Sequence, residues 1–153
     1  MKDLPDCGIY RTSRAIEDVP AGQLVYFHNH GDPGPGIYLP EKLHNNQVKF
    51  PALGRTLKDP VMAHTLEPIM DQALYRVARE FYCCSKNCVL FKVNQMVQLG
   101  YDGKANPILF FPFWKNSEMC FPQKGTRIDP ENFQFLERLH IQAESKHDPG
   151  MMH

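Results

Sequence analysis

Short alternations of apolar and polar residues recur along the chain and predict β-strands. Apolar and polar residues alternate with the period of a half-buried strand in two segments, 9–14 (Ile-Tyr-Arg-Thr-Ser-Arg) and 74–79 (Leu-Tyr-Arg-Val-Ala-Arg). Taken alone, residues 69–81 also fit an amphipathic helix. The matching segment at 9–14 is too short and too interrupted for a helix, so the pattern favours a strand in both places.

Two longer segments have the pattern of β-hairpins. An apolar and aromatic run at 24–30 is followed by Asp-Pro-Gly at 32–34 and by a second apolar run at 37–39. Proline presets φ for a turn and glycine accepts positive φ, so residues 32–34 are predicted to form the turn between two strands. Residues 96–110 repeat this arrangement around an Asp-Gly step.

Two short helices are also indicated. Asp59 is followed by Pro60, and Asp129 is followed by Pro130. Aspartate is favoured at the N-cap of a helix and proline at its first position. Pro60 and Pro130 are therefore each predicted to open a short helix.

The chain also matches itself. Residues 23–40 align without gaps on 95–112, and further matches lie upstream and downstream in the same order. We therefore predict a mostly β fold of two tandem repeats, 8–72 and 73–142, each a small β-barrel or sandwich unit with short helical turns. The repeats are expected to be related by a pseudo-twofold axis and packed as one compact body, with 143–153 as a flexible C-terminal tail.

A tyrosine followed by an arginine occurs at equivalent places in both repeats, at 10–11 and at 75–76. A residue that is needed twice at matching positions more often serves the fold than a single active site. We expect each arginine to stack on tyrosine and to pair with an acidic residue of the same repeat, Glu67 in the first and Glu137 in the second.

The amino-acid composition argues against several classes of function. Lys plus Arg and Asp plus Glu both number 17, which argues against binding to nucleic acid or to an anionic membrane surface. No apolar run approaches the length of about 18 residues that spans a bilayer, and the N-terminus has no apolar signal region. We therefore expect a cytoplasmic protein with its five cysteines mostly reduced. Cys7 and Cys120 stand alone in the sequence and are interpreted as packing or surface residues.

Two histidines at the end of the first hairpin strand form a candidate metal site. His28 and His30 are two residues apart, so both rings lie on one face of a strand. With Gly22, this Gly-x5-His-x-His spacing resembles the start of the cupin metal motif, which implies a glutamate a few residues later. The matching positions here hold Gly34 and Pro35. In the second repeat, glycine and aspartate replace the histidines, so the fold itself does not require them.

The second repeat carries an insertion at 82–88 that contains Cys83, Cys84 and Cys88. The Cys84-x3-Cys88 spacing brackets a short turn and predicts that these two thiols face each other, with Cys83 on the opposite strand face. Three interpretations stay open: inert cysteines, a disulfide or redox switch, and a zinc site whose remaining ligands come from His28, His30, His44, His64 or Cys120. Lys86 is expected to lower a neighbouring thiol pKa.

The function that the sequence favours is a non-enzymatic binding or adaptor module for a protein or peptide partner. Tyr38, Phe113 and Trp114 lie near proline-flanked loops and are the candidate binding residues. Lys42 stands at the position of Trp114 in the first repeat, so burial there is not obligatory. The alternatives are a zinc or thiol-redox site at the cysteine insertion and an enzyme with a pocket between the two halves. No cofactor other than zinc is expected, and a homo-oligomer is left open.

Overall fold

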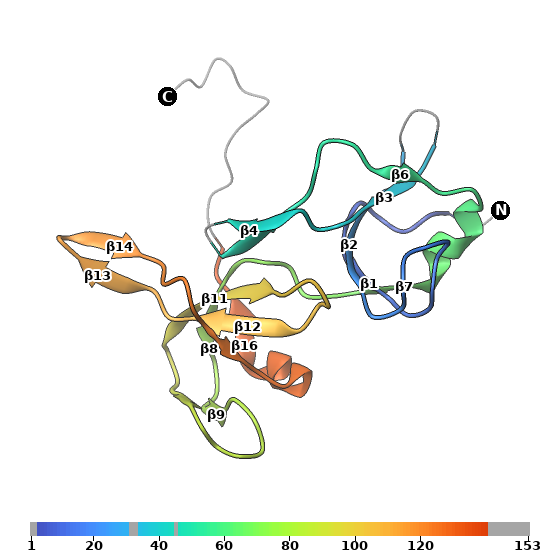
Figure 1. Cartoon of the computed structure of the whole chain (residues 1–153). Helices are drawn as coiled ribbons and strands as arrows, with labels where there is room; N and C mark the ends of the chain where they lie inside the picture. The colour runs from blue at the N-terminus through green and yellow to red at the C-terminus, as the bar shows by residue number, and fades with distance from the viewer. Residues whose placement is uncertain (1–2, 31–33, 45, 141–153) are drawn as a thin grey trace.

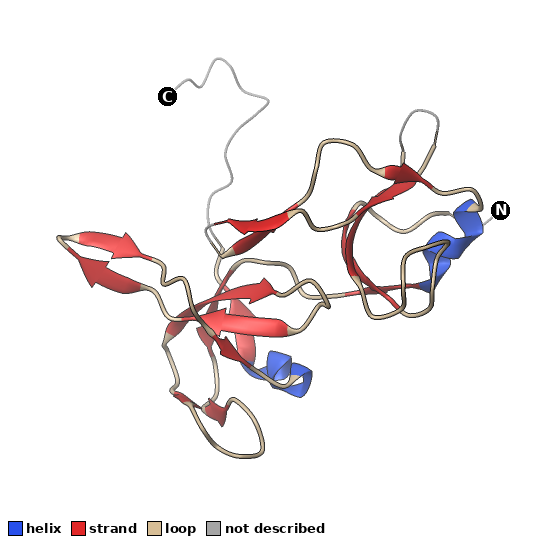
Figure 2. Cartoon of the chain, in the orientation of Figure 1, coloured by secondary structure: helices blue, strands red, loops and turns tan. Residues whose placement is uncertain are grey.

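The computed structural model describes residues 3–30, 34–44 and 46–140 (Figure 1). The predicted C-terminal tail, 143–153, lies outside these residues, as does most of the predicted turn at 32–34. Strands dominate the described chain, with two short 3-10 helices (Figure 2), so the predicted mostly β class is confirmed. Neither helix has the length and hydropathy that a bilayer-spanning helix needs.

Sheet 1 is built from the first half of the chain. Its five strands in chain order are β1 (Gly8–Thr12), β2 (Leu24–His28), β3 (Gly36–Tyr38), β6 (Arg55–Thr56) and β7 (Leu66–Pro68). The order across the sheet is β6-β3-β2-β1-β7, and every neighbouring pair is antiparallel. The predicted strand at 9–14 and the predicted first hairpin are therefore both present.

Sheet 2 is built from the second half and has the same order of strands. Its members are β8 (Leu74–Val77), β11 (Met96–Tyr101), β12 (Pro107–Phe110), β15 (Thr126–Arg127) and β16 (Leu136–Arg138). Across the sheet they run β15-β12-β11-β8-β16, all antiparallel. The segment 69–81 thus contains a strand and not a helix, as the sequence predicts.

Both sheets are open, so the predicted closed barrel is wrong for the residues that the structure describes. In each sheet the two edge strands, β6 and β7 or β15 and β16, pair only inward. Closing a barrel requires the edge strands to share a hydrogen-bonded ladder. Among the described residues the edge strands of each sheet share no such ladder.

Three two-stranded hairpins extend from the sheets. They are β4 (Lys42–His44) with β5 (Gln47–Lys49), β9 (Phe81–Tyr82) with β10 (Leu90–Phe91), and β13 (Phe113–Lys115) with β14 (Glu118–Cys120). Figure 1 shows β13 and β14 projecting away from the rest of the chain. By contrast, β5 packs against β11 of sheet 2.

The two predicted helix starts are confirmed as 3-10 helices, η1 (Pro60–Thr65) and η2 (Pro130–Phe135). At the start of η1, the Asp59 carboxylate accepts a hydrogen bond of 3.2 Å from the backbone N–H of Val61. Asp129 makes no such side-chain cap bond. Proline therefore opens both helices, but aspartate caps only the first.

Each sheet has its own group of buried side chains, and one strand contributes to both. Val25 and Phe27 of β2 pack in the core of sheet 1. Leu24 points to the opposite face of the strand and is buried in the core of sheet 2. Its backbone N–H also donates to the carbonyl oxygen of Gly103 at 2.9 Å. Strand β2 therefore ties the two sheets together.

The predicted arginine–glutamate pairs are confirmed in both sheets. Arg11 contacts Glu67 at 3.4 Å, and Arg76 contacts Glu137 at 2.9 Å. Both pairs are largely exposed, so each stabilises the fold by no more than about 1 kcal/mol. Arg79, which recurs as Arg14 in the first half, stacks on Phe135 with 5.8 Å to the ring centre, so the aromatic partner is not the predicted tyrosine.

Candidate metal centres and a candidate binding groove

Cys83, Cys84 and Cys88 converge in the loop between β9 and β10. Their sulfur atoms all lie within 4.8 Å of one another, and the thiol of Cys83 is 3.5 Å from the sulfur of Cys84. The predicted approach of Cys84 to Cys88 is therefore found. The predicted placement of Cys83 on the opposite face is wrong, because β9 ends at Tyr82 and the chain bends immediately after it.

The cysteine loop favours a thiolate at Cys84. The backbone N–H of Lys86 lowers the pKa of the Cys84 thiol, and a hydrogen bond from Cys83 adds to this effect. The pKa of Cys88 is raised, chiefly because its thiol hydrogen-bonds to Cys84. Lys86 thus acts mainly through its backbone and not through the charge that the sequence suggested. Three sulfur ligands suit soft metals such as Zn²⁺ or Cu⁺.

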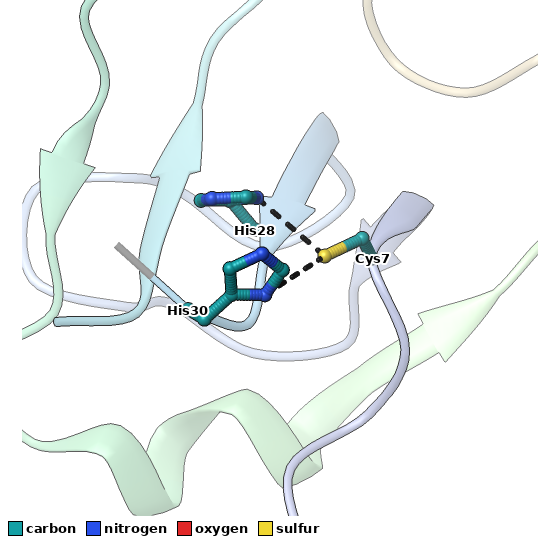
Figure 3. A group of neighbouring side chains, drawn as sticks. All are labelled: Cys7, His28 and His30. Atoms are coloured by element: carbon teal, nitrogen blue, oxygen red, sulfur yellow. Dashed lines mark hydrogen bonds between the residues drawn. The ribbon is translucent and has the colours of Figure 1, made fainter. Parts of the chain in front are cut away.

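His28 and His30 lie apart from the cysteine loop and face Cys7 (Figure 3). Cys7 Sγ is 3.5 Å from Nδ1 of His28 and 4.0 Å from Nδ1 of His30. The five predicted metal-binding residues therefore fall into two groups, and the interpretation of Cys7 as a packing or surface residue is incomplete. Strand register explains the contact: Gly8 pairs with Phe27, so Cys7 and His28 are the next residues outward.

Asn29 supports this group from its centre. Its backbone N–H donates to Cys7 Sγ at 3.3 Å, and its side-chain oxygen accepts from the Cys7 thiol at 3.3 Å. The same oxygen lies 2.5 Å from Nδ1 of His30. The side-chain nitrogen of Asn29 donates to the carbonyl oxygen of Pro5 at 3.1 Å. Asn29 therefore holds the segment before β1 against the end of β2.

The three candidate binding residues do not form one cluster, because Tyr38 lies apart from Phe113 and Trp114. Phe113 and Trp114 lie on β13, where both side chains are exposed, Trp114 by 72%. Tyr38 belongs to sheet 1 and packs edge-to-face on Tyr26, with ring centres 5.9 Å apart. Tyr38 therefore contributes to packing within sheet 1, while Phe113 and Trp114 offer an open apolar surface.

A groove of about 720 Å³ lies between hairpin β13–β14 and sheet 2. Its residues are Ala73, Leu74, Gln98, Met119, Cys120, Phe121, Gln123, Arg138, Leu139 and His140. Gln98 is only 6% exposed, and its side-chain oxygen has no hydrogen-bond donor among the residues that the structure describes. Buried polar atoms normally have a partner, so this oxygen is an exception that needs an explanation. Gln98 is not among the candidate residues that the sequence pattern indicates.

Met119 connects this groove with a second, smaller hollow. That hollow, of about 260 Å³, lies against Phe111, Phe113 and Trp114. Met119 lines both spaces, and in the ladder of the hairpin it stands directly opposite Trp114. The groove and the hollow beside the exposed aromatic residues therefore adjoin each other at Met119.

A third cavity, of about 460 Å³, lies between the two halves. Its charged pair is Arg11 with Glu67, and Tyr101 forms part of its wall. The Tyr101 hydroxyl donates to the carbonyl oxygen of Met70 at 2.6 Å, and burial raises the pKa of this tyrosine well above its usual range. Tyr101 thus stays protonated at neutral pH and acts here as a hydrogen-bond donor to the backbone.

The chain matches no protein-family model, no curated protein and no solved structure. The groove and the two ligand clusters are the features of the molecule that bear on its function.

Proposed function

We propose that the protein is a non-enzymatic binding module that holds an extended peptide segment of a partner protein in the groove beside hairpin β13–β14. The observation that carries this proposal is Gln98, which lines the groove and whose buried side-chain oxygen has no hydrogen-bond donor among the described residues. Leaving a buried acceptor unpaired costs about 1–3 kcal/mol. A ligand that brings an N–H group into the groove recovers this free energy, so the site is prepared for a donor.

The apolar part of the groove suits a peptide side chain. Met119 and Phe121 line it and are both exposed, and Phe113 and Trp114 continue the apolar surface around the hairpin. Aromatic residues and methionine are enriched at protein interfaces, and tryptophan is enriched among the residues that dominate their binding energy. A contiguous exposed surface of this kind is a sign of an interaction site in a soluble protein.

The edge of sheet 2 favours a polypeptide over a small molecule. Strand β16 is an edge strand, and the groove runs along its end at Arg138, Leu139 and His140. An edge strand presents backbone N–H and C=O groups that an extended chain can pair with. Gln98 lies on β11, two strands in from this edge, so a peptide that begins at the end of β16 must cross β8 within the groove to reach Gln98, Met119 and Phe121.

Peptide selection followed by calorimetry tests this proposal. Random short peptides displayed on phage are selected on the purified protein, and the affinity of a selected peptide is measured for the wild type and for Gln98→Leu. We expect Gln98→Leu to weaken binding about 10-fold, which is about 1.4 kcal/mol. Its free energy of unfolding should stay equal or rise, because an unpaired buried oxygen is removed.

Gln134→Leu is the matched control. Gln134 is exposed on η2, away from the groove, and donates to the backbone oxygen of Glu131. This variant should bind the peptide as the wild type does. Equal affinity of wild type and Gln98→Leu would contradict the proposed role of the groove. If no peptide is selected and the protein forms dimers in light scattering, the hairpin is an interface between two copies instead.

We propose further that the two halves of the chain are tandem repeats of one β unit. It is supported by the equal strand order of the two sheets and by the arginine–glutamate pair in each. It is further supported by hydrogen bonds of 2.7 Å from Tyr10 to the Asp6 carbonyl and from Tyr75 to the Asp71 carbonyl. Related sequences, once aligned, should keep these positions matched between the halves; a relative with only one half that folds alone would be the strongest support.

The cysteine loop favours a second candidate function, a thiol-redox site with Cys84 as the nucleophile. Because the pKa of Cys84 is lowered and that of Cys88 is raised, Cys84 keeps its thiolate to a lower pH. Iodoacetamide should therefore modify Cys84 at a lower pH than Cys88, and mass spectrometry of the alkylated peptides measures both rates. In Cys84→Ser, the rate at Cys88 should increase. Faster alkylation of Cys88 at low pH would exclude this role.

A further inference from the structure

We propose that Cys7, His28 and His30 form a binding site for a divalent transition metal, with Zn²⁺ as the best match. The site is separate from the binding groove and from the cysteine loop, so it does not depend on either. Three side chains from two segments of the chain direct one sulfur and two ring nitrogens to a common point (Figure 3). Thiolate and imidazole are the ligand types that zinc takes in proteins.

The distances fit zinc without a rearrangement of the strands. With Zn–S of about 2.3 Å and Zn–N of about 2.0–2.1 Å, tetrahedral geometry separates a sulfur ligand from a nitrogen ligand by about 3.6 Å. The observed separations from Cys7 Sγ are 3.5 Å to His28 Nδ1 and 4.0 Å to His30 Nδ1. The rings of His28 and His30 have centres 4.3 Å apart and are tilted by 47°, so they meet without stacking flat. The three ligand atoms therefore lie near the corners of a coordination shell.

The surroundings of Cys7 orient its sulfur as a metal ligand. The backbone N–H of Asn29 points at the sulfur, and such second-layer hydrogen bonds orient metal ligands and tune them. Cys7 and His30 each donate a hydrogen bond to the side-chain oxygen of Asn29, and zinc would displace these two protons on binding. Three protein ligands leave the fourth tetrahedral position for water or for that oxygen.

The second half of the chain shows that the hairpin does not need these residues. Asp102 stands at the position of His30, and its carboxylate accepts hydrogen bonds of 2.9 Å from the backbone N–H groups of Lys104 and Asn106. Gly100 stands at the position of His28. The turn between β11 and β12 is thus stabilised by a carboxylate. The histidines after β2 add metal-binding chemistry to a hairpin that the fold builds without them.

A cysteine–histidine pair is also the arrangement of an activated nucleophile. Such a pair needs one base, whereas two histidines face the same sulfur here, which matches a metal site better. The two readings differ in a measurable way. A metal site retains zinc and protects Cys7 from alkylation, while a nucleophilic pair retains no metal and leaves Cys7 reactive in the presence of zinc.

The test uses the full chain carrying Cys84→Ser and Cys88→Ser, which removes two ligands of the other cluster. The protein is stripped with a chelator, loaded with ZnCl₂, desalted and assayed for zinc by mass spectrometry. We expect about one zinc per chain, and Cys7→Ser or His30→Ala should lower the zinc affinity at least about 100-fold, since even second-layer partners affect it 10–100-fold. Cobalt(II) in place of zinc should give a thiolate charge-transfer band that Cys7→Ser abolishes.

His64→Ala is the control, because His64 is an exposed histidine on η1 and is not part of either ligand cluster. This variant should bind zinc as the parent does. His30 is exposed, so His30→Ala should fold normally, and circular dichroism verifies that its loss of zinc is not unfolding. Absence of bound zinc in the parent, or zinc affinity that Cys7→Ser and His30→Ala leave unchanged, would overturn the proposal.

Discussion

Replacement of Trp114 by alanine is expected to weaken binding of a selected peptide at least about 30-fold and to leave the free energy of unfolding unchanged. Hot-spot residues at interfaces contribute about 2 kcal/mol or more, and tryptophan is enriched among them. Trp114 is 72% exposed and so contributes little to the core. Its removal should therefore affect binding and not stability, and calorimetry with thermal unfolding measures both.

The place of Trp114 explains the size of this effect. It pairs across the hairpin with Met119, which lines both the groove and the adjoining hollow. Cross-strand neighbours of this kind pack against each other, so loss of the indole also loosens Met119. Leu53 is the matched control, because it is an exposed apolar residue of the first half, 86% exposed. If Leu53→Ala weakens binding as much as Trp114→Ala does, the effect is not specific to the hairpin.

Phe91→Ala is expected to lower the free energy of unfolding by about 3–5 kcal/mol. The Phe91 side chain is fully buried, and its ring stacks between those of Phe81 and Phe111, with ring centres 4.9 Å away in each case. Alanine leaves a cavity between two aromatic rings that cannot close on each other. Because Phe91 belongs to hairpin β9–β10, the same change should also expose the buried thiol of Cys83 to alkylation.

Urea unfolding followed by circular dichroism measures the loss at Phe91. Val93→Ala is the control, because Val93 is half exposed two residues further along the chain and should change stability by less than about 0.5 kcal/mol. A loss at Phe91 no larger than that at Val93 would mean that the stacked aromatic residues do not stabilise the fold as their burial implies.

Much of the fold could be predicted because it depends on local patterns that occur twice. The strand at 74–79 looked ambiguous alone, and its match at 9–14 decided it. The Asp-Pro steps before Pro60 and Pro130 identified both helices, since cap preferences act within a few residues. Closure of the sheets could not be predicted, because it depends on the number, tilt and stagger of all the strands and not on a local pattern of residues.

The candidate sites, like the fold, could be predicted only where they depend on residues close together in sequence. The approach of Cys84 to Cys88 follows from a turn of a few residues and was predicted. Cys7 and His28 are 21 residues apart in sequence and meet only through the register of β1 with β2, so Cys7 looked isolated. Extending the pairing of β1 with β2 by one residue beyond Gly8 would have predicted the contact between Cys7 and His28.

Gln98 was missed because a glutamine in a strand is usually on the solvent face. The signal that could have identified it is its counterpart in the first half, Tyr26. That tyrosine packs on Phe50, with ring centres 5.9 Å apart. The shorter amide at position 98 leaves space where the first half has an aromatic ring, and we expect the groove to exist for this reason.

The fluorescence of Trp114 reports directly on peptide binding in the groove, because Trp114 is the only tryptophan in the chain. A selected peptide that lacks tryptophan is added to the protein, and the emission spectrum is recorded. Binding in the groove predicts a blue shift that saturates at the affinity measured by calorimetry and that needs higher peptide concentrations in Gln98→Leu. A peptide that binds by calorimetry but leaves the emission of Trp114 unchanged would contradict binding in the groove, because it would bind elsewhere on the protein.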